Sequence, residues 1–273
     1  MTAPRIIRNH PAEQYHADPA LSAGRVITAH QRSWMHAMQL GERKATPAML
    51  EGSLLHCMVL EPGRVGARYA AIPHGLKLST VDGRAWVENV TAAGLQAIPH
   101  DAWVRCGTMA FDLKLHPAVR PLLEAANDRE LSLWWTDRIT GIRLKARPDA
   151  ISGRAVIDLK RSDASPDGFR RAAATYRHDM RAAWYLDGAT ACGLDVDRYV
   201  YIVVEPEPPH AVALYEIAEE DLDLARWRID KLLEEYAEHQ ARGEWPGYPT
   251  EVQTIEMPPW ARIRQEVMDV VEW

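Results

Sequence analysis

The chain has 273 residues, 47% of them hydrophobic, which is enough for a sizeable core in one large domain or two small ones. Its formal charge of -6 excludes a uniformly basic nucleic-acid-binding protein, although 17 acidic and only 6 basic residues lie from Glu205 onward, so the preceding part carries 26 basic against 21 acidic residues. Cys57, Cys106 and Cys192 are isolated, which excludes the paired-cysteine motifs of zinc and iron–sulfur sites.

No apolar run approaches the length of a membrane span, and no charged-then-apolar leader opens the sequence. We therefore expect a cytoplasmic protein with no membrane partner and no disulfides. We also expect a single domain over 1–273, divided into a mainly helical part (1–125), a sheet-and-helix part (126–217) and an acidic C-terminal helix and tail (218–273).

The first part of the chain predicts helices over 22–40 and 48–60, a loop over 74–84, and further helices over 85–125 that are interrupted at Pro99 and Pro117. In the second helix, Gly52 and His56 are four residues apart and share a face. The small residue would let a backbone or a substrate approach, and either ring nitrogen of His56 would suit a metal ion. Taken alone, a histidine such as His56 is more often a hydrogen-bonded core residue than a metal ligand.

Residues 131–135 predict a strand, the segment from Asp137 to Gly141 a turn, and the following residues a second strand of a hairpin. In that second strand Ile142, Leu144 and Ala146 alternate with Arg143, Lys145 and Arg147. By parity the polar face continues to Asp149, so a cationic stripe that DNA phosphates can follow is expected to lead to this acidic residue. The alternative is that the stripe is only a solvated face.

Asp149 and the sequence Asp158-Leu159-Lys160, nine residues further on, form the pattern Pro-Asp, spacer, Asp-x-Lys. Side chains alternate along a strand, so Asp158 and Lys160 project to one side and Leu159 to the other. If Asp149 ends the preceding strand of a hairpin, its carboxylate meets that of Asp158. Two such carboxylates supply the oxygen ligands that Mg²⁺ or Mn²⁺ prefers, and Lys160 would hold the attacking water.

Further along, 166–192 predicts one long helix, and 198–205 and 210–217 predict two strands around the turn from Pro206 to Pro209. Residues 219–242 have the spacing of an amphipathic helix, which we assign to packing or subunit contact. The tryptophans, Trp184 included, are expected in the core rather than as platforms for DNA bases.

The order of these motifs resembles the PD-(D/E)XK nucleases of the RecB/RecE kind, and more narrowly the RecE-type exonucleases, or exodeoxyribonuclease VIII. The resemblance spans about residues 15–248. It is carried by Tyr15-His16-Ala17-Asp18 with Leu21-Ser22, Gly52 to His56 with Leu60-Glu61-Pro62, Glu130-Leu131-Ser132 with Trp135, Arg147-Pro148-Asp149, Asp158-Leu159-Lys160, Tyr185 with Asp187-Gly188, Glu205-Pro206, and Trp245 to Tyr248.

The resemblance implies an α/β fold with a restriction-endonuclease-like core, in which a central mixed sheet is flanked by helices and extended by helical additions at both ends. It implies that His56, Asp149, Asp158 and the Leu159 carbonyl bind the metal and that Lys160 is the catalytic lysine. Glu130 occupies a recurrent acidic position whose role stays open, and a solvated strand-start residue is the alternative. Arg181 stands where the related Gln-x-x-x-Tyr motif has Gln, four residues before Tyr185. These two residues would contact DNA, unless Arg181 is a structural ion-pair partner.

The implied activity is magnesium-dependent (or manganese-dependent) hydrolysis of linear double-stranded DNA from the 5′ strand, which leaves a 3′ overhang for a single-strand annealing protein in phage-type recombination or repair. The family also implies a homo-oligomer, in some members a ring. Two alternatives remain: a PD-(D/E)XK endonuclease, which would also cut closed circular DNA, and a non-catalytic DNA-binding recombination protein.

Overall fold

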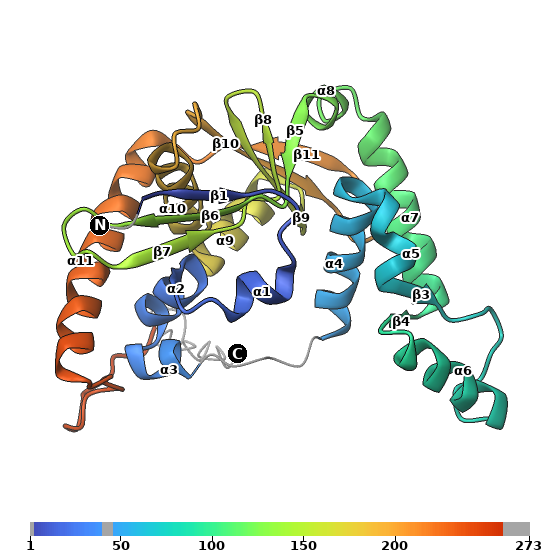
Figure 1. Cartoon of the computed structure of the whole chain (residues 1–273), viewed down its shortest axis with the longest axis horizontal. Helices are drawn as coiled ribbons and strands as arrows, with labels where there is room; N and C mark the ends of the chain where they lie inside the picture. The colour runs from blue at the N-terminus through green and yellow to red at the C-terminus, as the bar shows by residue number, and fades with distance from the viewer. Residues whose placement is uncertain (1–2, 40–45, 259–273) are drawn as a thin grey trace, which may run out of the picture.

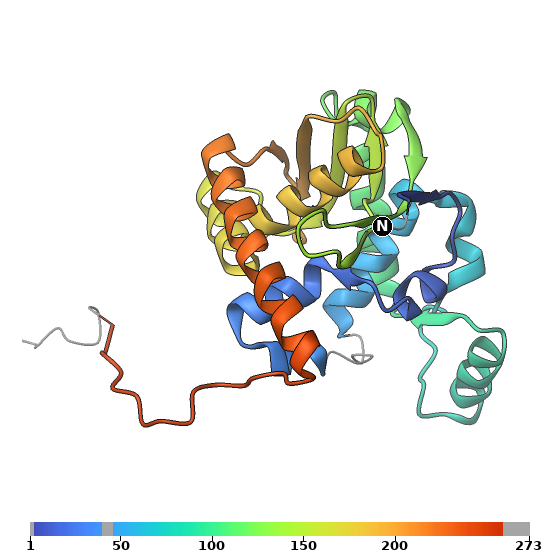
Figure 2. The ribbon, with the colours of Figure 1, turned by 60° about the vertical axis from the view of Figure 1, so that its left-hand side comes forward.

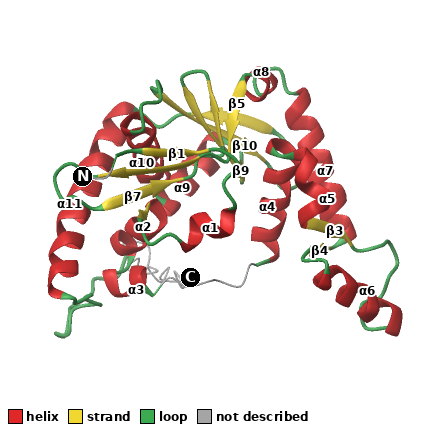
Figure 3. Cartoon of the chain, in the orientation of Figure 1, coloured by secondary structure: helices red, strands yellow, loops and turns green. Residues whose placement is uncertain are grey.

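The computed structural model describes residues 3–39 and 46–258. Its centre is a five-stranded sheet with the order β11-β10-β9-β8-β5 (Figures 1 and 3). The strands in this spatial order are Val212–Tyr215, Arg198–Val204, Ala155–Arg161, Ala150–Ser152 and Ala126–Arg129. β9 and β10 are parallel, and the other neighbours are antiparallel. This is the mixed α/β sheet expected from the sequence.

β9 and β10 are central because both carry apolar side chains on both faces, as strands covered by helices on two sides do. Val156, Tyr199 and Tyr201 belong to the core on one face, together with residues of α2 (Ala23–Gln31), α10 (His178–Ala191) and α11 (Glu219–Arg242). Ile157 and Leu159 belong to the core on the other face, with residues of α4 (Pro47–Leu60) and α7 (His100–Leu115). Figure 1 shows these two groups of helices on opposite sides of the sheet.

A second, four-stranded sheet has the order β1-β6-β7-β2, with strands Arg5–Ile7, Ser132–Thr136, Arg143–Ala146 and Leu21–Ser22. The predicted hairpin of β6 and β7 is confirmed, and its turn is closed by a hydrogen bond from the Asp137 amide to the Ile142 carbonyl (2.9 Å). Gly141 has a φ of 72°, which glycine adopts without steric cost. α10 crosses this sheet closely, because Gly188 leaves room for the ring of Trp135.

The remaining elements range from three to 12 residues in length. They are α1 Ala12–Ala17, α3 Trp34–Met38, a 3₁₀ helix Pro62–Arg64, α5 Val65–Arg68, β3 Tyr69–Ala71, α6 Val81–Ala92, β4 Gln96–Ile98, α8 Arg120–Glu124 and α9 Pro166–Tyr176. β3 and β4 pair in parallel and carry α6, which projects from the body in Figures 1 and 2. No helix in the described part of the chain is long and apolar enough to cross a membrane.

Several predicted boundaries are wrong for local reasons. The helix predicted over 22–40 is divided at Ser33, whose hydroxyl caps α3 by accepting a hydrogen bond from the His36 amide. The helix predicted over 166–192 is broken at Arg177, which takes a left-handed backbone conformation (φ 53°) between α9 and α10. The loop predicted over 74–84 ends earlier, because Thr80 caps α6. By contrast, the helix over 219–242 is confirmed and packs in the core.

The chain changes sheets between β7 and β8, so Asp149 does not continue the face of β7. β7 ends at Ala146 in the four-stranded sheet, and β8 begins at Ala150 in the five-stranded sheet. Asp149 therefore precedes a strand instead of ending one. The hairpin that places it beside Asp158 is formed by β8 and β9.

Candidate active site

Three acidic residues lie at one level across neighbouring strands of the central sheet. β5 pairs with β8 through Arg129 and Ala150, so the next residue, Glu130, faces Asp149, and its amide donates to the Asp149 carbonyl (2.9 Å). β8 pairs with β9 through Ala150 and Ile157, so Asp149 faces Asp158 in turn. The Asp149 carboxylate also accepts a hydrogen bond from the Leu159 amide (2.8 Å). The sheet register thus collects carboxylates from three separate segments.

α4 brings His56 to this group from the other side of the sheet. The helix begins at Pro47 with Thr46 as its cap, and its Glu51 pairs with Arg161 at the end of β9 (2.7 Å). His56 Nε2 lies 2.7 Å from the Leu159 carbonyl, and Nδ1 lies 3.3 Å from Asp149 Oδ2. A carbonyl only accepts hydrogen bonds, so Nε2 carries the proton and the neutral ring keeps its lone pair on Nδ1. Burial, reinforced by Lys160, lowers the pKa of His56 and keeps the ring neutral.

His56, Glu130 and Asp149 together can hold a metal ion. One ligand atom from each lies within 4.8 Å of the others. Burial, and then the neighbouring Asp158 carboxylate, raises the pKa of Asp149 well above its usual range. Carboxylates that repel one another in a partly buried site, beside a neutral imidazole, fit a divalent cation that prefers oxygen and nitrogen ligands. The donor set therefore suits the magnesium or manganese ion expected from the sequence.

Glu130 is held in place by its backbone and by Arg147. Its φ of 51° lies in the left-handed region, which non-glycine residues rarely adopt and which often marks functional sites. The Arg147 guanidinium donates to the Glu130 carboxylate (2.7 Å) and also to Ser132 Oγ and the His10 carbonyl. A solvated strand-start residue would have neither constraint, so the structure places Glu130 with the site.

Asp158 and Lys160 project to the same side of β9 and form an ion pair, while Leu159 is buried on the opposite face. The second oxygen of Asp158 accepts a hydrogen bond from the Tyr199 hydroxyl (2.8 Å). Burial alone would raise the pKa of Asp158, but the charges of Lys160 and Arg181 and the hydrogen bonds lower it to about 2. Asp158 is therefore ionised and paired with a lysine, whereas the partners of Asp149 are the Leu159 amide and the neutral His56 ring.

Arg181 and Tyr185 lie beside Asp158 on α10. Burial alone would lower the pKa of Arg181, but Tyr185 and Asp158 raise it, so the guanidinium stays charged. Arg181 forms no ion pair with any residue that the structure describes, so the structural ion-pair alternative is not supported there. Trp184, on the same helix, is 2% exposed and donates to the Lys145 carbonyl (3.0 Å), which confirms that it belongs to the core.

The exposed cationic stripe predicted along β7 is wrong. Only Arg143 is exposed, and it pairs with Asp18 (3.3 Å). Lys145 is 4% exposed, and its ammonium donates to the carbonyls of Tyr15 (2.7 Å) and Asp18 (2.6 Å). The side chain of Arg147 is also buried. The N-terminal segment around α1 covers this face of β7, and strand periodicity cannot reveal such a cover.

The Leu159 carbonyl accepts the His56 proton and thereby orients the imidazole, as backbone carbonyls commonly do for histidine ligands. Because this oxygen keeps a second lone pair, its role as a further metal ligand stays a prediction. A Cβ atom added at Gly52 would meet open space, so no described backbone packs closely there. Sequence reasoning also missed Tyr199. The available signal was two tyrosines on one face of an otherwise apolar strand, because a buried phenol needs a hydrogen-bond partner.

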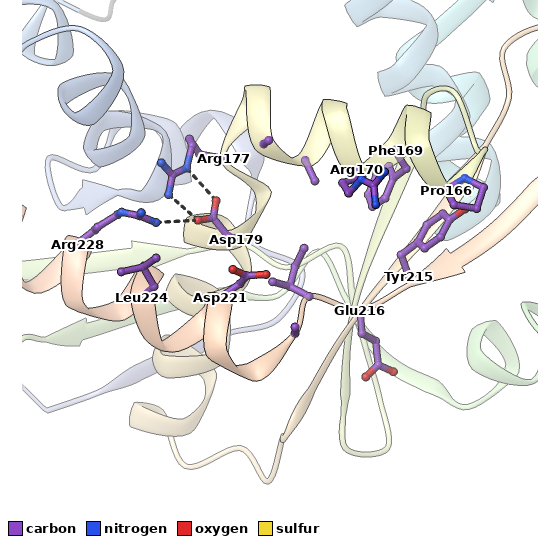
Figure 4. A pocket seen from close by; sticks show the side chains of 14 residues that line it. Pro166, Phe169, Arg170, Arg177, Asp179, Tyr215, Glu216, Asp221, Leu224 and Arg228 are labelled. Atoms are coloured by element: carbon purple, nitrogen blue, oxygen red, sulfur yellow. Dashed lines mark hydrogen bonds and ion pairs between the residues drawn. The ribbon is translucent and has the colours of Figure 1, made fainter.

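A cavity of about 460 Å³ lies apart from this site, between α9, β11 and the start of α11 (Figure 4). Its apolar wall includes the stacked rings of Phe169 and Tyr215. At one end Asp179 pairs with Arg177 and, at 3.7 Å, with Arg228. None of the predicted site residues lines this cavity.

The mixed sheet, with acidic residues and a lysine on its central strands and a histidine from a flanking helix, defines a protein of the PD-(D/E)XK class. Consistent with this, residues 22–258 match the family model described as a PDDEXK-like domain of unknown function (DUF3799), and the chain belongs to that family. No curated protein matches the sequence.

Among solved structures, the chain is similar to a putative exonuclease from Eubacterium rectale, with 10% identity, a TM-score of 0.61, and coverage of 92% of this chain and 96% of that one. At this identity the similarity shows the fold alone. Protein VC1899 from Vibrio cholerae also matches, with 8% identity and coverage of 89% of this chain and 60% of that one, but its TM-score of 0.24 is too low to indicate a shared fold.

Proposed function

We propose that the protein is a metal-dependent DNA nuclease that hydrolyses phosphodiester bonds. The observation that carries this proposal is the convergence of His56, Glu130 and Asp149 within 4.8 Å, next to the Asp158–Lys160 pair. Ligands for a divalent cation and an ammonium group thus lie side by side in one partly buried site. Membership of a PDDEXK-like family supports this reading.

In the proposed reaction, a water oxygen bonds to phosphorus while the bond from phosphorus to the leaving oxygen breaks, and the leaving oxygen ends protonated. Lys160 holds the attacking water and stabilises the negative charge that develops on the phosphate. His56, Glu130, Asp149 and Asp158 would hold the ion, either one Mg²⁺ or a pair, with Mn²⁺ as a substitute. When bound, such an ion supplies Lewis-acid stabilisation and lowers the pKa of water. Arg181, charged and without an ion-pair partner in the described residues, binds a backbone phosphate by charge-assisted hydrogen bonds, with Tyr185 beside it.

We further propose that the enzyme is an exonuclease of the RecE type that resects linear double-stranded DNA from the 5′ strand. The 3′ overhang would then pass to a single-strand annealing protein in recombination or repair, and the enzyme would act as a homo-oligomer. The sequence resemblance supports these finer statements, and the structural neighbour from Eubacterium rectale carries the name of putative exonuclease.

The test is digestion of linear duplex labelled at the 5′ or the 3′ end, with and without Mg²⁺, by the wild type and by Lys160→Ala. We expect label release by the wild type only when metal is present, with 5′ label released first. Lys160→Ala is expected to lose activity by a factor on the order of 10² to 10³, because it removes a charge that stabilises the transition state. Lys231→Ala, which removes an exposed lysine paired with Glu234 on α11, is the matched control and should keep full activity.

A closed circular duplex distinguishes the modes of cleavage. An exonuclease leaves the circle intact, whereas cutting of the circle would establish an endonuclease in its place. DNA binding without any metal-dependent digestion would favour the non-catalytic recombination protein.

A further inference from the structure

Tyr199 is the one side chain besides Lys160 that is hydrogen-bonded to the Asp158 carboxylate among the described residues. It lies on β10, which pairs in parallel with β9, on the same face as Asp158. Its hydroxyl donates to Asp158 Oδ2 at 2.8 Å, while Oδ1 pairs with Lys160. Both Tyr199 and Asp158 are 3% exposed. The two oxygens of this carboxylate therefore have different and fixed partners.

The tyrosine itself has little freedom to move. Its ring lies 4.9 Å from that of Tyr201 and 6.2 Å from that of Tyr185, and it belongs to the core beneath α10. A hydrogen bond from a neutral hydroxyl to an ionised carboxylate is strong and directional. A rigid phenol on the neighbouring strand therefore fixes the rotation of the Asp158 side chain about its bond to Cβ.

We propose that Tyr199 is a positioning residue, which holds Asp158 so that one oxygen stays anchored and the other faces Lys160 and the metal. This inference deepens the proposed nuclease function and rests on it. Oδ1 already pairs with Lys160, and the hydroxyl keeps Oδ2 away from the cations of the chain. Without the hydroxyl, Oδ2 is free to swing toward the Lys160 ammonium or the Arg181 guanidinium. Metal binding would then have to compete with these cations for both oxygens instead of one.

Tyr201 provides a matched control. It lies two residues further along the same face of β10, is 0% exposed, and donates its hydroxyl to the His178 carbonyl at 2.7 Å. Tyr199→Phe and Tyr201→Phe therefore each remove one buried hydroxyl group and one hydrogen bond from the same strand. Only the first of these hydrogen bonds reaches a proposed metal ligand.

The experiment measures Mn²⁺ binding by calorimetry and the Mg²⁺ concentration for half-maximal digestion of linear duplex, with the full chain in each case. Loss of a group that orients a metal ligand typically costs about 10- to 100-fold in metal affinity. We expect Tyr199→Phe to raise both the dissociation constant and the half-maximal concentration within that range, and Tyr201→Phe to change them less than about twofold. Unfolding of both variants in EDTA checks that the fold is retained.

A second measurement separates positioning from a general effect on stability. Adding Tyr199→Phe to Asp158→Asn should leave the residual Mn²⁺ affinity unchanged, because the residue acts only through that carboxylate. Three results would each overturn the proposal. They are an unchanged Mn²⁺ dissociation constant in Tyr199→Phe, an equal rise of this constant in both phenylalanine variants, and an additive loss of Mn²⁺ affinity in the double variant. If the wild type binds Mn²⁺ but leaves DNA intact, the nuclease proposal fails while the binding shift still decides the role of Tyr199. A wild type that binds no divalent cation overturns both.

Discussion

Asp149 and Asp158 face each other across the β8–β9 hairpin, yet their surroundings change their pKa values in opposite directions. Burial and the nearby carboxylate raise the pKa of Asp149, whereas Lys160, Arg181 and Tyr199 lower that of Asp158. Carboxylates that differ in this way can take different roles in one reaction. We assign Asp149, with His56 and Glu130, to holding the cation, and Asp158 to linking the cation with Lys160.

His178, which lies near this site without belonging to it, leads to a prediction about acid stability. It is 7% exposed and lies between the rings of Phe169 and Tyr201, and its Nδ1 atom has no hydrogen-bond partner within the described part of the chain. Burial, and then the positive charges of Lys160 and Arg181, lower the pKa of His178 from 6.5 to about 4. The folded protein thus disfavours the protonated ring. The neutral His178 ring therefore makes its full contribution to the free energy of unfolding above pH 6.5, and this contribution is lost as the pH falls toward 4.

As the pH falls through this range, the free energy of unfolding should decrease by on the order of 3 kcal/mol, because a difference of one in pKa corresponds to about 1.4 kcal/mol. His178→Phe keeps a stacked ring but cannot be protonated. We expect urea unfolding in EDTA to show a stability difference between the variant and the wild type that grows by this amount from pH 7.5 to pH 4. Parallel stability profiles for the two proteins would contradict the assignment.

The elements place the site through three strand ends and one helix. β5, β8 and β9 each contribute an acidic residue at the same level, and the Glu51–Arg161 pair attaches α4 to the end of β9. α10 then supplies Arg181 and Tyr185, so its distance from the sheets matters. Gly188 sets this distance, because a Cβ atom there would lie 2.5 Å from the Trp135 ring.

Two glycine-to-alanine substitutions in helices should therefore have opposite effects. Gly188→Ala drives a methyl group into a buried ring and should destabilise the protein by about 1 to 3 kcal/mol. Gly107→Ala on α7 meets nothing within 4 Å and should stabilise it by up to about 1 kcal/mol through helix propensity. Denaturant unfolding of both variants tests this contrast, and destabilisation of similar size in the two would show that the close approach of α10 is not the cause.

At the scale of the whole molecule, the site lies where the two halves of the core meet. One half covers the face of the central sheet that carries Asp158 and Lys160, and the other contains α4 with His56. The proposed ligands come from α4, β5, β8 and β9, which are far apart in the sequence and separate when the protein unfolds. An ion bound by all of them therefore binds the folded state only. The ion should consequently stabilise the entire fold rather than one loop.

We expect Mn²⁺ at about 100 times its dissociation constant to stabilise the wild type by about 2.7 kcal/mol relative to EDTA. Asp149→Asn should lose this gain because it removes a charged ligand, whereas Lys160→Ala should keep most of it because the ligands remain. Thermal unfolding with and without metal measures both effects. Equal stabilisation of the wild type and Asp149→Asn would mean that the ion binds elsewhere.

The sequence alone was sufficient for features that depend on neighbours along the chain. Alternation along a strand places Asp158 and Lys160 on one side and Leu159 on the other, and the turn residues after Thr136 predict the β6–β7 hairpin. The apolar spacing over 219–242 predicts α11 with its observed bounds. These features follow from local backbone geometry, so periodicity and turn chemistry are enough to find them.

Only the tertiary structure decided what lies against each residue. Lys145 alternates with apolar residues along its strand, as an exposed residue does, but the segment around α1 covers it. The Arg147 side chain donates to Glu130 instead of facing solvent. The partnership of Asp158 with Tyr199, 41 residues away, depends on the parallel register of β9 and β10. Pairing between distant segments leaves no periodic trace in the sequence, since it arises from how the sheets and helices pack together. For the same reason the chain's change of sheets between Ala146 and Ala150, which sets the position of Asp149, could be seen only in the folded molecule.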